Sequence, residues 1–118
     1  MLFYKNLDTT HLVISTREFN CKHLQLLTPN TTDGAHEKHV PFVKVDGSNI
    51  NVVVGEVKHP MLENHYIEAI IIETNKQLHV KELKPGDDPV FNITLENDEE
   101  PLRVLEYCNL HGLWGLEL

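Results

Sequence analysis

The sequence comprises 118 residues, of which 18 are acidic and 10 are basic, giving a formal net charge of −8. A chain of this length suits a single domain with a self-supporting core. The acidic excess argues against binding to nucleic-acid phosphates or to anionic membranes, because both need clustered lysine and arginine. Eight histidines stand beside only two cysteines. Since histidine is a common metal ligand and titrates near neutral pH, the histidines are the first candidates for a functional site.

The cysteines and the apolar segments favour a cytoplasmic location. Cys21 and Cys108 can form at most one disulfide, which is no framework for a small secreted domain. The first eight residues lack the apolar segment of a signal peptide, and the longest apolar run, residues 69–72, is too short to cross a bilayer. In a reducing cytoplasm, a lone cysteine accompanied by several histidines is a better candidate for a metal ligand than for half a disulfide.

Short strand patterns follow one another along the chain. The first 35 residues are the least regular, with residues 11–15 fitting a strand and residues 27–34 a loop. Residues 43–45 and 50–54, separated by the turn signal Asp46-Gly47, predict a β-hairpin.

The second half of the chain continues this pattern. Residues 66–72 are β-branched and too few for a typical helix, so they predict a buried strand. Residues 78–83 and 90–95 alternate between apolar and polar side chains, and residues 103–107 predict a last strand. No segment shows a sustained helical period, and the spacing of the strands is typical of a sandwich. We therefore predict an all-β antiparallel sandwich.

Three segments at loops or strand ends concentrate residue types that bind metals. One of them contains the Cys-x-x-His step Cys108 to His111, which places a thiolate and an imidazole on one side of a tight turn, as a chelating site requires. Each cluster alone is a weak signal, but together they predict a metal site. Imidazoles with one thiolate suit zinc, copper or iron. The segments are Ala35-His36-Glu37-Lys38-His39-Val40-Pro41, His59-Pro60-Met61-Leu62-Glu63-Asn64-His65 and Cys108-Asn109-Leu110-His111-Gly112.

These segments resemble the superoxide reductases, the family that includes desulfoferrodoxins and neelaredoxins. The motifs occur in the family's order, and the similarity runs from about Thr32 to Trp114. The matching motifs are Thr32-Asp33-Gly34, Glu37-Lys38-His39-Val40-Pro41, His59-Pro60-Met61 with His65-Tyr66-Ile67-Glu68, Leu83-Lys84-Pro85-Gly86-Asp87, and Cys108-Asn109-Leu110-His111-Gly112 with Trp114.

The resemblance implies an immunoglobulin-like β-sandwich that holds one mononuclear non-haem iron per chain. It implies that Cys108 supplies an axial thiolate and that the opposite position is open to superoxide. Glu37 matches the carboxylate that occupies this position once the iron is ferric, and Lys38 matches the lysine beside the open site. The imidazoles implied as equatorial ligands are those of His39, His59, His65 and His111.

The activity implied by the resemblance is superoxide reductase, in which superoxide is reduced by one electron to hydrogen peroxide for detoxification. Because a net charge of −8 repels superoxide at long range, Lys38 is expected to attract it locally. Rubredoxin is the family's usual electron donor, and relatives form dimers and tetramers. We therefore expect a rubredoxin-like donor and a homo-oligomer.

The N-terminal segment departs from the desulfoferrodoxin pattern. Desulfoferrodoxins carry a small N-terminal domain whose four cysteines hold a second iron, whereas this segment contains only Cys21. We therefore predict a degenerate segment without a metal site at residues 1–35 and an iron-binding sandwich domain at residues 36–118. Glu68 is expected either to contact a ligand imidazole or to face solvent, and Trp114 to pack under the last ligand loop. The histidines interpreted as surface or packing residues are His11, His23 and His79.

Two other functions fit the same residues. A non-catalytic iron-binding or electron-transfer protein would keep the centre without turnover, but ligation alone needs neither Glu37 nor Lys38. A zinc-stabilised interaction module is the third possibility, although five candidate ligands exceed the four that structural zinc sites use. The sequence thus favours an enzyme, an oxidoreductase acting on superoxide.

Overall fold

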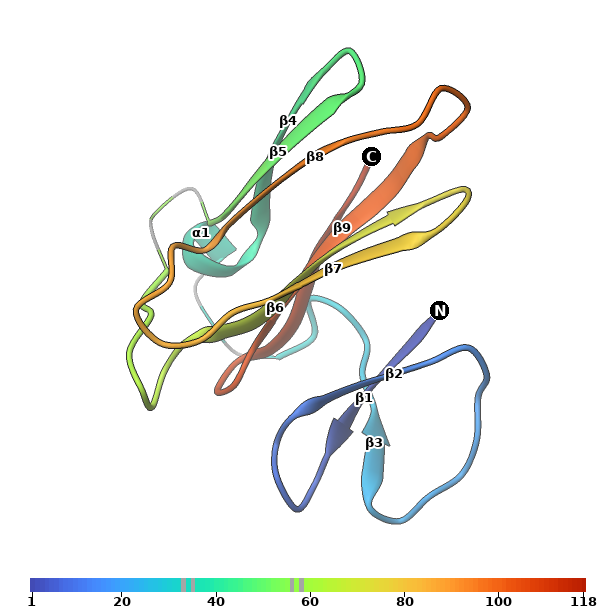
Figure 1. Ribbon diagram of the computed structural model, residues 1–118. Coiled ribbons are helices and arrows are strands. Elements are labelled where there is room, and N and C mark those ends of the chain that lie inside the picture. The colour runs from blue at the N-terminus through green and yellow to red at the C-terminus, as the bar shows by residue number, and fades with distance from the viewer. Residues whose placement is uncertain (33, 35, 56, 58) are drawn as a thin grey trace.

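The computed structural model describes residues 1–32, 34, 36–55, 57 and 59–118, without the side chains of His36 and Glu37. It confirms the predicted all-β antiparallel sandwich, in which a four-stranded and a three-stranded sheet face each other and a third sheet lies at the N-terminus (Figure 1). In the described part of the chain, no helix has the length and apolar character needed to cross a membrane. The elements are β1 Leu2–Asn6, β2 Leu12–Ser15, β3 Leu24–Leu26, α1 His36–His39, β4 Pro41–Asp46, β5 Asn49–Val54, β6 Ile67–Thr74, β7 Leu78–Glu82, β8 Val90–Thr94, β9 Pro101–Cys108 and β10 Gly112–Glu117.

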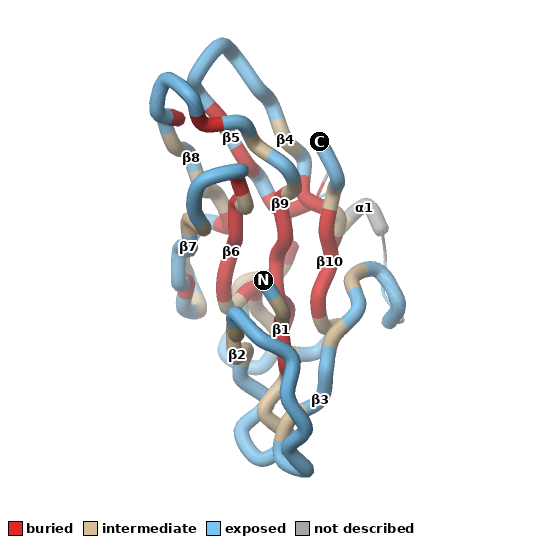
Figure 2. Tube along the Cα trace, turned by 90° about the vertical axis from the view of Figure 1, so that its right-hand side faces the viewer, coloured by how far each residue is buried: buried red, intermediate tan, exposed pale blue. Residues whose placement is uncertain are grey.

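The four-stranded sheet, in the order β10-β9-β6-β7, is the middle layer of the molecule. Ile70 and Ile72 of β6 pack with Val52 of β5 in the three-stranded sheet β4-β5-β8, whereas Ile71 packs with Phe3 of the N-terminal sheet β2-β1-β3. Figure 2 shows β6, β9 and β10 as the buried centre. Burial on both faces explains why residues 69–72 of β6 form a continuous apolar run instead of an alternating one.

The predicted strands are present, with shifted ends. The β4–β5 hairpin is confirmed, but both strands are longer than predicted and Asp46 pairs with Asn49, so the turn comprises residues 47–48. Strands β1, β3 and β10 were not predicted. In β1 the adjacent side chains of Phe3 and Tyr4 are both buried, a pattern without the alternation that marks a strand in sequence.

The N-terminal sheet is attached to the middle layer by polar contacts as well as by apolar packing. The buried Tyr107 hydroxyl donates a 2.6 Å hydrogen bond to the Thr10 carbonyl. The Arg103 guanidinium lies over the Phe3 ring, 5.5 Å from its centroid. These contacts join β9 to the first ten residues of the chain.

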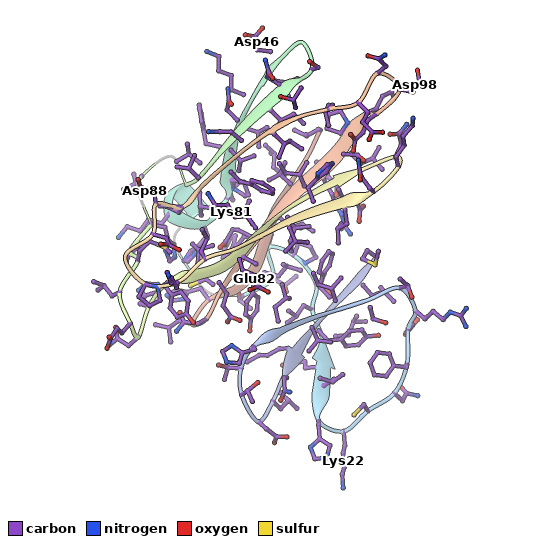
Figure 3. The ribbon with its side chains drawn as sticks, viewed as in Figure 1. Lys22, Asp46, Lys81, Glu82, Asp88 and Asp98 are labelled. Atoms are coloured by element: carbon purple, nitrogen blue, oxygen red, sulfur yellow. The ribbon has the colours of Figure 1, made fainter. Side chains whose placement is uncertain are left out.

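A buried carboxylate, Glu99, closes one end of the sandwich, where the β6–β7 turn meets the loop before β9. Its Oε2 atom accepts a 2.6 Å hydrogen bond from the Thr74 hydroxyl and lies 2.7 Å from His79 Nε2, while Oε1 accepts from the Glu96 backbone N–H. The hydrogen bonds from Thr74 and then His79 lower the pKa of Glu99 to about 2. The neighbouring Asp98, by contrast, projects from the exposed tip of this loop (Figure 3).

We predict that Glu99 makes stability dependent on pH in the acid range. Because its pKa is lower in the folded than in the unfolded chain, its contribution is complete above about pH 4.3, the usual glutamate value, and is lost as the pH falls toward 2. Urea unfolding of Glu99→Gln should show lower stability than wild type at pH 7 and a smaller loss on acidification. Glu100→Gln, an exposed change in the same loop, should follow wild type. Parallel pH profiles for Glu99→Gln and wild type would contradict this.

Candidate metal centre

The end of the sandwich opposite Glu99 gathers the predicted ligands, and the pairing of β6 with β9 sets their positions. Ile67 at the start of β6 pairs with Cys108 at the end of β9. The turn that carries His65 therefore lies beside the turn that carries His111. The loops at one end of a rigid sheet thus bring together residues far apart in the sequence.

The short helix α1 brings Lys38 and His39 to the same end of the sandwich. Gly55, which follows β5, has φ of +80°, and a Cβ there would lie 2.5 Å from the Lys38 carbonyl oxygen. Only glycine permits this approach. The Gly55 N–H also donates to the Val40 carbonyl, so α1 is fixed against the end of β5.

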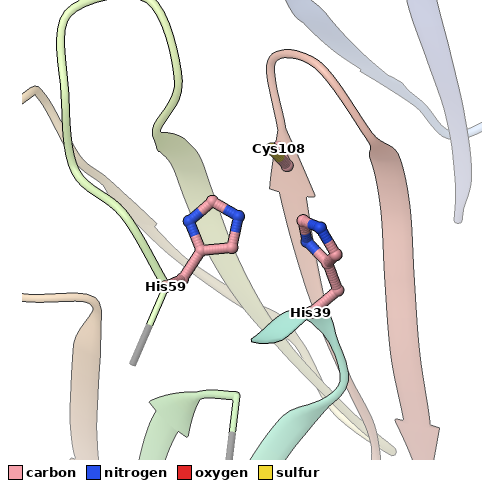
Figure 4. Close-up of side chains that lie close together, drawn as sticks. All are labelled: His39, His59 and Cys108. Atoms are coloured by element: carbon pink, nitrogen blue, oxygen red, sulfur yellow. The ribbon is translucent and has the colours of Figure 1, made fainter. Parts of the chain in front are cut away.

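Four imidazoles and one thiol converge in this region. The potential ligand atoms of His39, His59 and Cys108 all lie within 4.8 Å of one another, and so do those of His39, His65 and His111. Figure 4 shows the side chains of His39, His59 and Cys108 pointing toward a common region, from α1, from the loop before β6 and from the end of β9. All five predicted nitrogen and sulfur donors are thus brought together.

The electrostatics of the cluster favour neutral imidazoles. Burial, then the neighbouring histidines and then Lys38, lowers the pKa of His39 to about 3. Burial is also the main reason that the pKa of His59 falls to about 4 and that the pKa of His65 is lowered. Neutral imidazole is the form that binds metals, so the site holds these histidines ready for ligation at neutral pH.

The buried thiol of Cys108 is a less ready ligand in the absence of a cation. Burial raises its pKa to about 11, although hydrogen bonds from the backbone N–H groups of His111 and Leu110 act in the opposite direction. A bound metal cation deprotonates a coordinating thiol. The environment of Cys108 therefore disfavours a free reactive thiolate.

Unpartnered nitrogen atoms show which side of two rings is available to a metal. His59 Nδ1 lies 2.6 Å from the Pro60 carbonyl oxygen, which fixes the proton on Nδ1 and leaves a lone pair on the buried Nε2. The Nε2 atom of His65 is likewise buried and has no hydrogen-bond partner among the described residues. Buried polar atoms without partners are rare in proteins. Metal ligation accounts for both, so the residues fit a metal centre.

Polar and aromatic contacts hold the ligand loops in place. Asn109 Oδ1 accepts a 2.9 Å hydrogen bond from the Tyr66 N–H, and its Nδ2 donates to the Asn64 carbonyl. Trp114 stacks on the His39 ring, with centroids 5.1 Å apart, and donates to the His111 carbonyl. As expected, Trp114 therefore packs under the last ligand loop.

Gly34 lies against the stacked rings of His39 and Trp114. A Cβ on Gly34 would come within 2.9 Å of His39 Cδ2 and 3.1 Å of Trp114 Cζ2. A larger residue at this position would have to displace the imidazole or the indole. Gly34, the last residue of the Thr-Asp-Gly motif, thus contributes a packing surface for His39.

Other predicted residues lie elsewhere or are not described. The side chain of Glu37 lies outside the described part of the chain, so its role as a carboxylate ligand stays a prediction. Cys21 is free and exposed. Glu68 Oε1 lies 2.9 Å from Nδ1 of His11, which is outside the cluster. The Glu68 side chain is only 16% exposed, so it does not face mainly solvent. Three histidines outside the cluster contact a carboxylate, in the pairs His11–Glu68, His23–Asp8 and His79–Glu99.

Glu106 is the residue that the sequence analysis missed. It is completely buried in β9, and its Oε1 lies 3.6 Å from His39 Nδ1. Burial raises the pKa of its carboxyl group well above the usual value. A signal was present, because Glu106 is a charged residue inside the apolar strand Val104 to Tyr107 and lies two positions before Cys108.

Comparison with known proteins identifies relatives of this chain. A sequence model of the desulfoferrodoxin family matches residues 31–117. A desulfoferrodoxin homologue from Archaeoglobus fulgidus is 45% identical over 91 residues, which cover 77% of this chain and 71% of the homologue. The superoxide reductase from Treponema pallidum has the same fold with a TM-score of 0.80 and 33% identity, covering 98% of both chains. The one-iron superoxide reductase from Giardia intestinalis matches with a TM-score of 0.60 and 29% identity, covering 70% of this chain and 99% of its own.

We predict that Asn109→Ala weakens the link between the two ligand turns. The substitution removes the hydrogen bonds of Asn109 with the part-buried Tyr66 N–H and the exposed Asn64 carbonyl, so the free energy of unfolding of the metal-free protein should fall by about 1 kcal/mol. Urea unfolding measures this difference. Asn92→Ala, on the exposed face of β8, serves as the control and should leave the stability almost unchanged. An equal effect of both substitutions would show that Asn109 does not brace the turns.

Proposed function

Because this chain belongs to the desulfoferrodoxin family, we propose that it is a superoxide reductase that reduces superoxide to hydrogen peroxide at a mononuclear iron centre. The family match covers residues 31–117, and the solved structures with the same fold include superoxide reductases. The residues proposed to hold the iron are His39, His59, His65, Cys108 and His111.

The observation that carries the proposal is the convergence of four imidazoles and one thiol at one end of the sandwich. Structural zinc sites use four ligands, so a fifth nitrogen or sulfur donor supports iron over structural zinc. The neutral state of His39 and His59, which follows from their lowered pKa values, supports ligation at neutral pH. The non-haem iron would supply the electron, cycling between Fe(II) and Fe(III).

The protein's own residues would attract and bind the anionic substrate. Lys38 is half-buried in α1, and its charge contributes to the lowered pKa values of His39, His59 and His65. A cation this close to the cluster offers local attraction to superoxide on a chain whose net charge is −8. We propose that Lys38 draws in the substrate and that Glu37, from the same helix, would supply a carboxylate to the iron.

The alternative of a non-catalytic iron or electron-transfer protein is less well supported. Such a protein needs the ligands but not a lysine beside them, and a cation disfavours iron binding by repulsion. Lys38 is therefore best explained by an anionic substrate. A rubredoxin-like electron donor, a dimer or tetramer, a cytoplasmic location and the division of the chain into residues 1–35 and 36–118 stay predictions from the sequence.

We predict that the protein binds about one iron per chain and that Cys108→Ser abolishes the reduction of superoxide. Iron content by elemental analysis and peroxide yield on exposure to superoxide measure the two effects. Cys21→Ser is the matched control, since Cys21 is exposed and outside the cluster, and should behave as wild type. Stoichiometric zinc that iron cannot replace, or full activity in Cys108→Ser, would rule out the proposed centre.

We predict that Lys38→Glu slows the second-order reaction with superoxide about tenfold or more, the scale of electrostatic steering. In wild type, attraction by Lys38 should make the rate fall as ionic strength rises, and this fall should be absent in Lys38→Glu. Fast kinetics with pulse-generated superoxide at several salt concentrations provides the measurement. Lys76→Glu changes the net charge equally at the far end of the sandwich and should have a much smaller effect. Equal rates for the two variants would contradict local attraction by Lys38.

A further inference from the structure

Glu106 is a buried carboxyl group that the proposed reaction does not use. Its side chain has no exposed surface, and neither carboxyl oxygen has a hydrogen-bond partner in the described part of the chain. Its neighbours across the sheet are Ile70 of β6 and Trp114 of β10. An apolar residue would suit this position better, because an unpartnered buried polar group destabilises the fold.

The alternation of β9 directs Glu106 toward the metal cluster. Val104 and Cys108 belong to the core between the two sandwich sheets, whereas Leu105 and Tyr107 pack against the N-terminal sheet. Because side chains alternate along a strand, Glu106 lies on the same face as Cys108. The carboxyl group is thus directly adjacent to the ligands without belonging to either group of converging donor atoms.

The group that faces this carboxyl is the ring of His39. His39 Nδ1 lies 3.6 Å from Glu106 Oε1, and this nitrogen is also buried without a hydrogen-bond partner. A shift of ~0.6 Å would bring the two atoms to ordinary hydrogen-bond distance. A hydrogen bond between His39 Nδ1 and Glu106 Oε1 would therefore satisfy both buried groups.

The other contacts of His39 leave its ring orientation undetermined. Stacking on Trp114 fixes the plane of the ring. However, a 180° rotation about the Cβ–Cγ bond keeps that plane and exchanges the edge bearing Nδ1 with the edge bearing Cδ2. An acceptor on one side selects the orientation with Nδ1 toward Glu106, and Nε2 then remains for the metal. His59 achieves the same result with the Pro60 carbonyl.

We propose that Glu106 is a positioning residue whose carboxyl group accepts the Nδ1–H of His39 and so holds Nε2 toward the metal. This inference rests on the proposed function, since it assumes that the cluster binds iron. The carboxyl group keeps an acceptor oxygen whether or not it carries a proton. Carboxyl–histidine–metal arrangements orient the ligand ring and increase its basicity.

An apolar substitution of Glu106 shows whether this residue positions His39 or only stabilises the fold. In Glu106→Met the metal-free protein should be at least as stable as wild type in urea, because a buried unpartnered carboxyl group is removed. Its dissociation constant for Fe(II), measured anaerobically against a competing chelator, should rise about 10–100-fold. Glu106→Gln keeps an acceptor of the same shape and should restore most of the affinity. Val104→Ala, on the same face of β9, should lose stability without this loss of affinity.

The results distinguish the two proposals. Wild-type protein that binds no iron would overturn the proposed function. Wild-type protein that binds iron, together with an unchanged affinity in Glu106→Met or an affinity loss matched by Val104→Ala, would overturn only the role of Glu106. If Glu106→Met does not fold, NMR of zinc-loaded wild type decides the question. The Nδ1 proton of His39 should exchange slowly with solvent and shift in Glu106→Gln, and an unshifted signal would overturn the inference.

Discussion

The pairing of β6 with β9, which sets Ile67 opposite Cys108, is the constraint on which the candidate site depends. It places the turn carrying His65 beside the turn carrying His111, and Asn109 then bridges the two with side-chain hydrogen bonds. The pairing itself is stabilised by burial on both faces of the middle sheet. A rigid, doubly buried sheet thus provides fixed positions for ligands on otherwise irregular loops.

Burial of polar groups at this end of the sandwich is unfavourable, and the proposed metal would supply the partner that these groups lack. Lowered pKa values keep His39 and His59 neutral, and the Cys108 thiol keeps its proton. In the described part of the chain, ring nitrogens of His39, His59 and His65 also lack hydrogen-bond partners. Such a collection destabilises a fold when it is left unpaired. A cation that accepts the imidazole lone pairs and a thiolate turns the same groups into a stabilising centre, so iron binding is expected to contribute to folding.

The sequence predicted the members of the cluster better than the strands that position them. His39, His59, His65, Cys108 and His111 stand out because metal-binding residue types recur beside turn residues, and all five converge. The strands β1 and β10 were missed because adjacent side chains are both buried, Phe3 and Tyr4 in β1 and Leu113 and Trp114 in β10, which leaves no alternating pattern. Glu106 was missed because an acidic residue in a strand ordinarily indicates a solvent-facing position. Only the three-dimensional arrangement shows that it lies on the Cys108 face next to His39.

The central claim is that the cluster binds iron which gives one electron to superoxide. It is tested most directly by exposing the ferrous protein to a pulse of superoxide and measuring iron oxidation, peroxide and oxygen together. The proposed function predicts one peroxide for each superoxide consumed and each iron oxidised, with no oxygen released. Half as much peroxide with release of oxygen, or superoxide that leaves the iron ferrous, would contradict it.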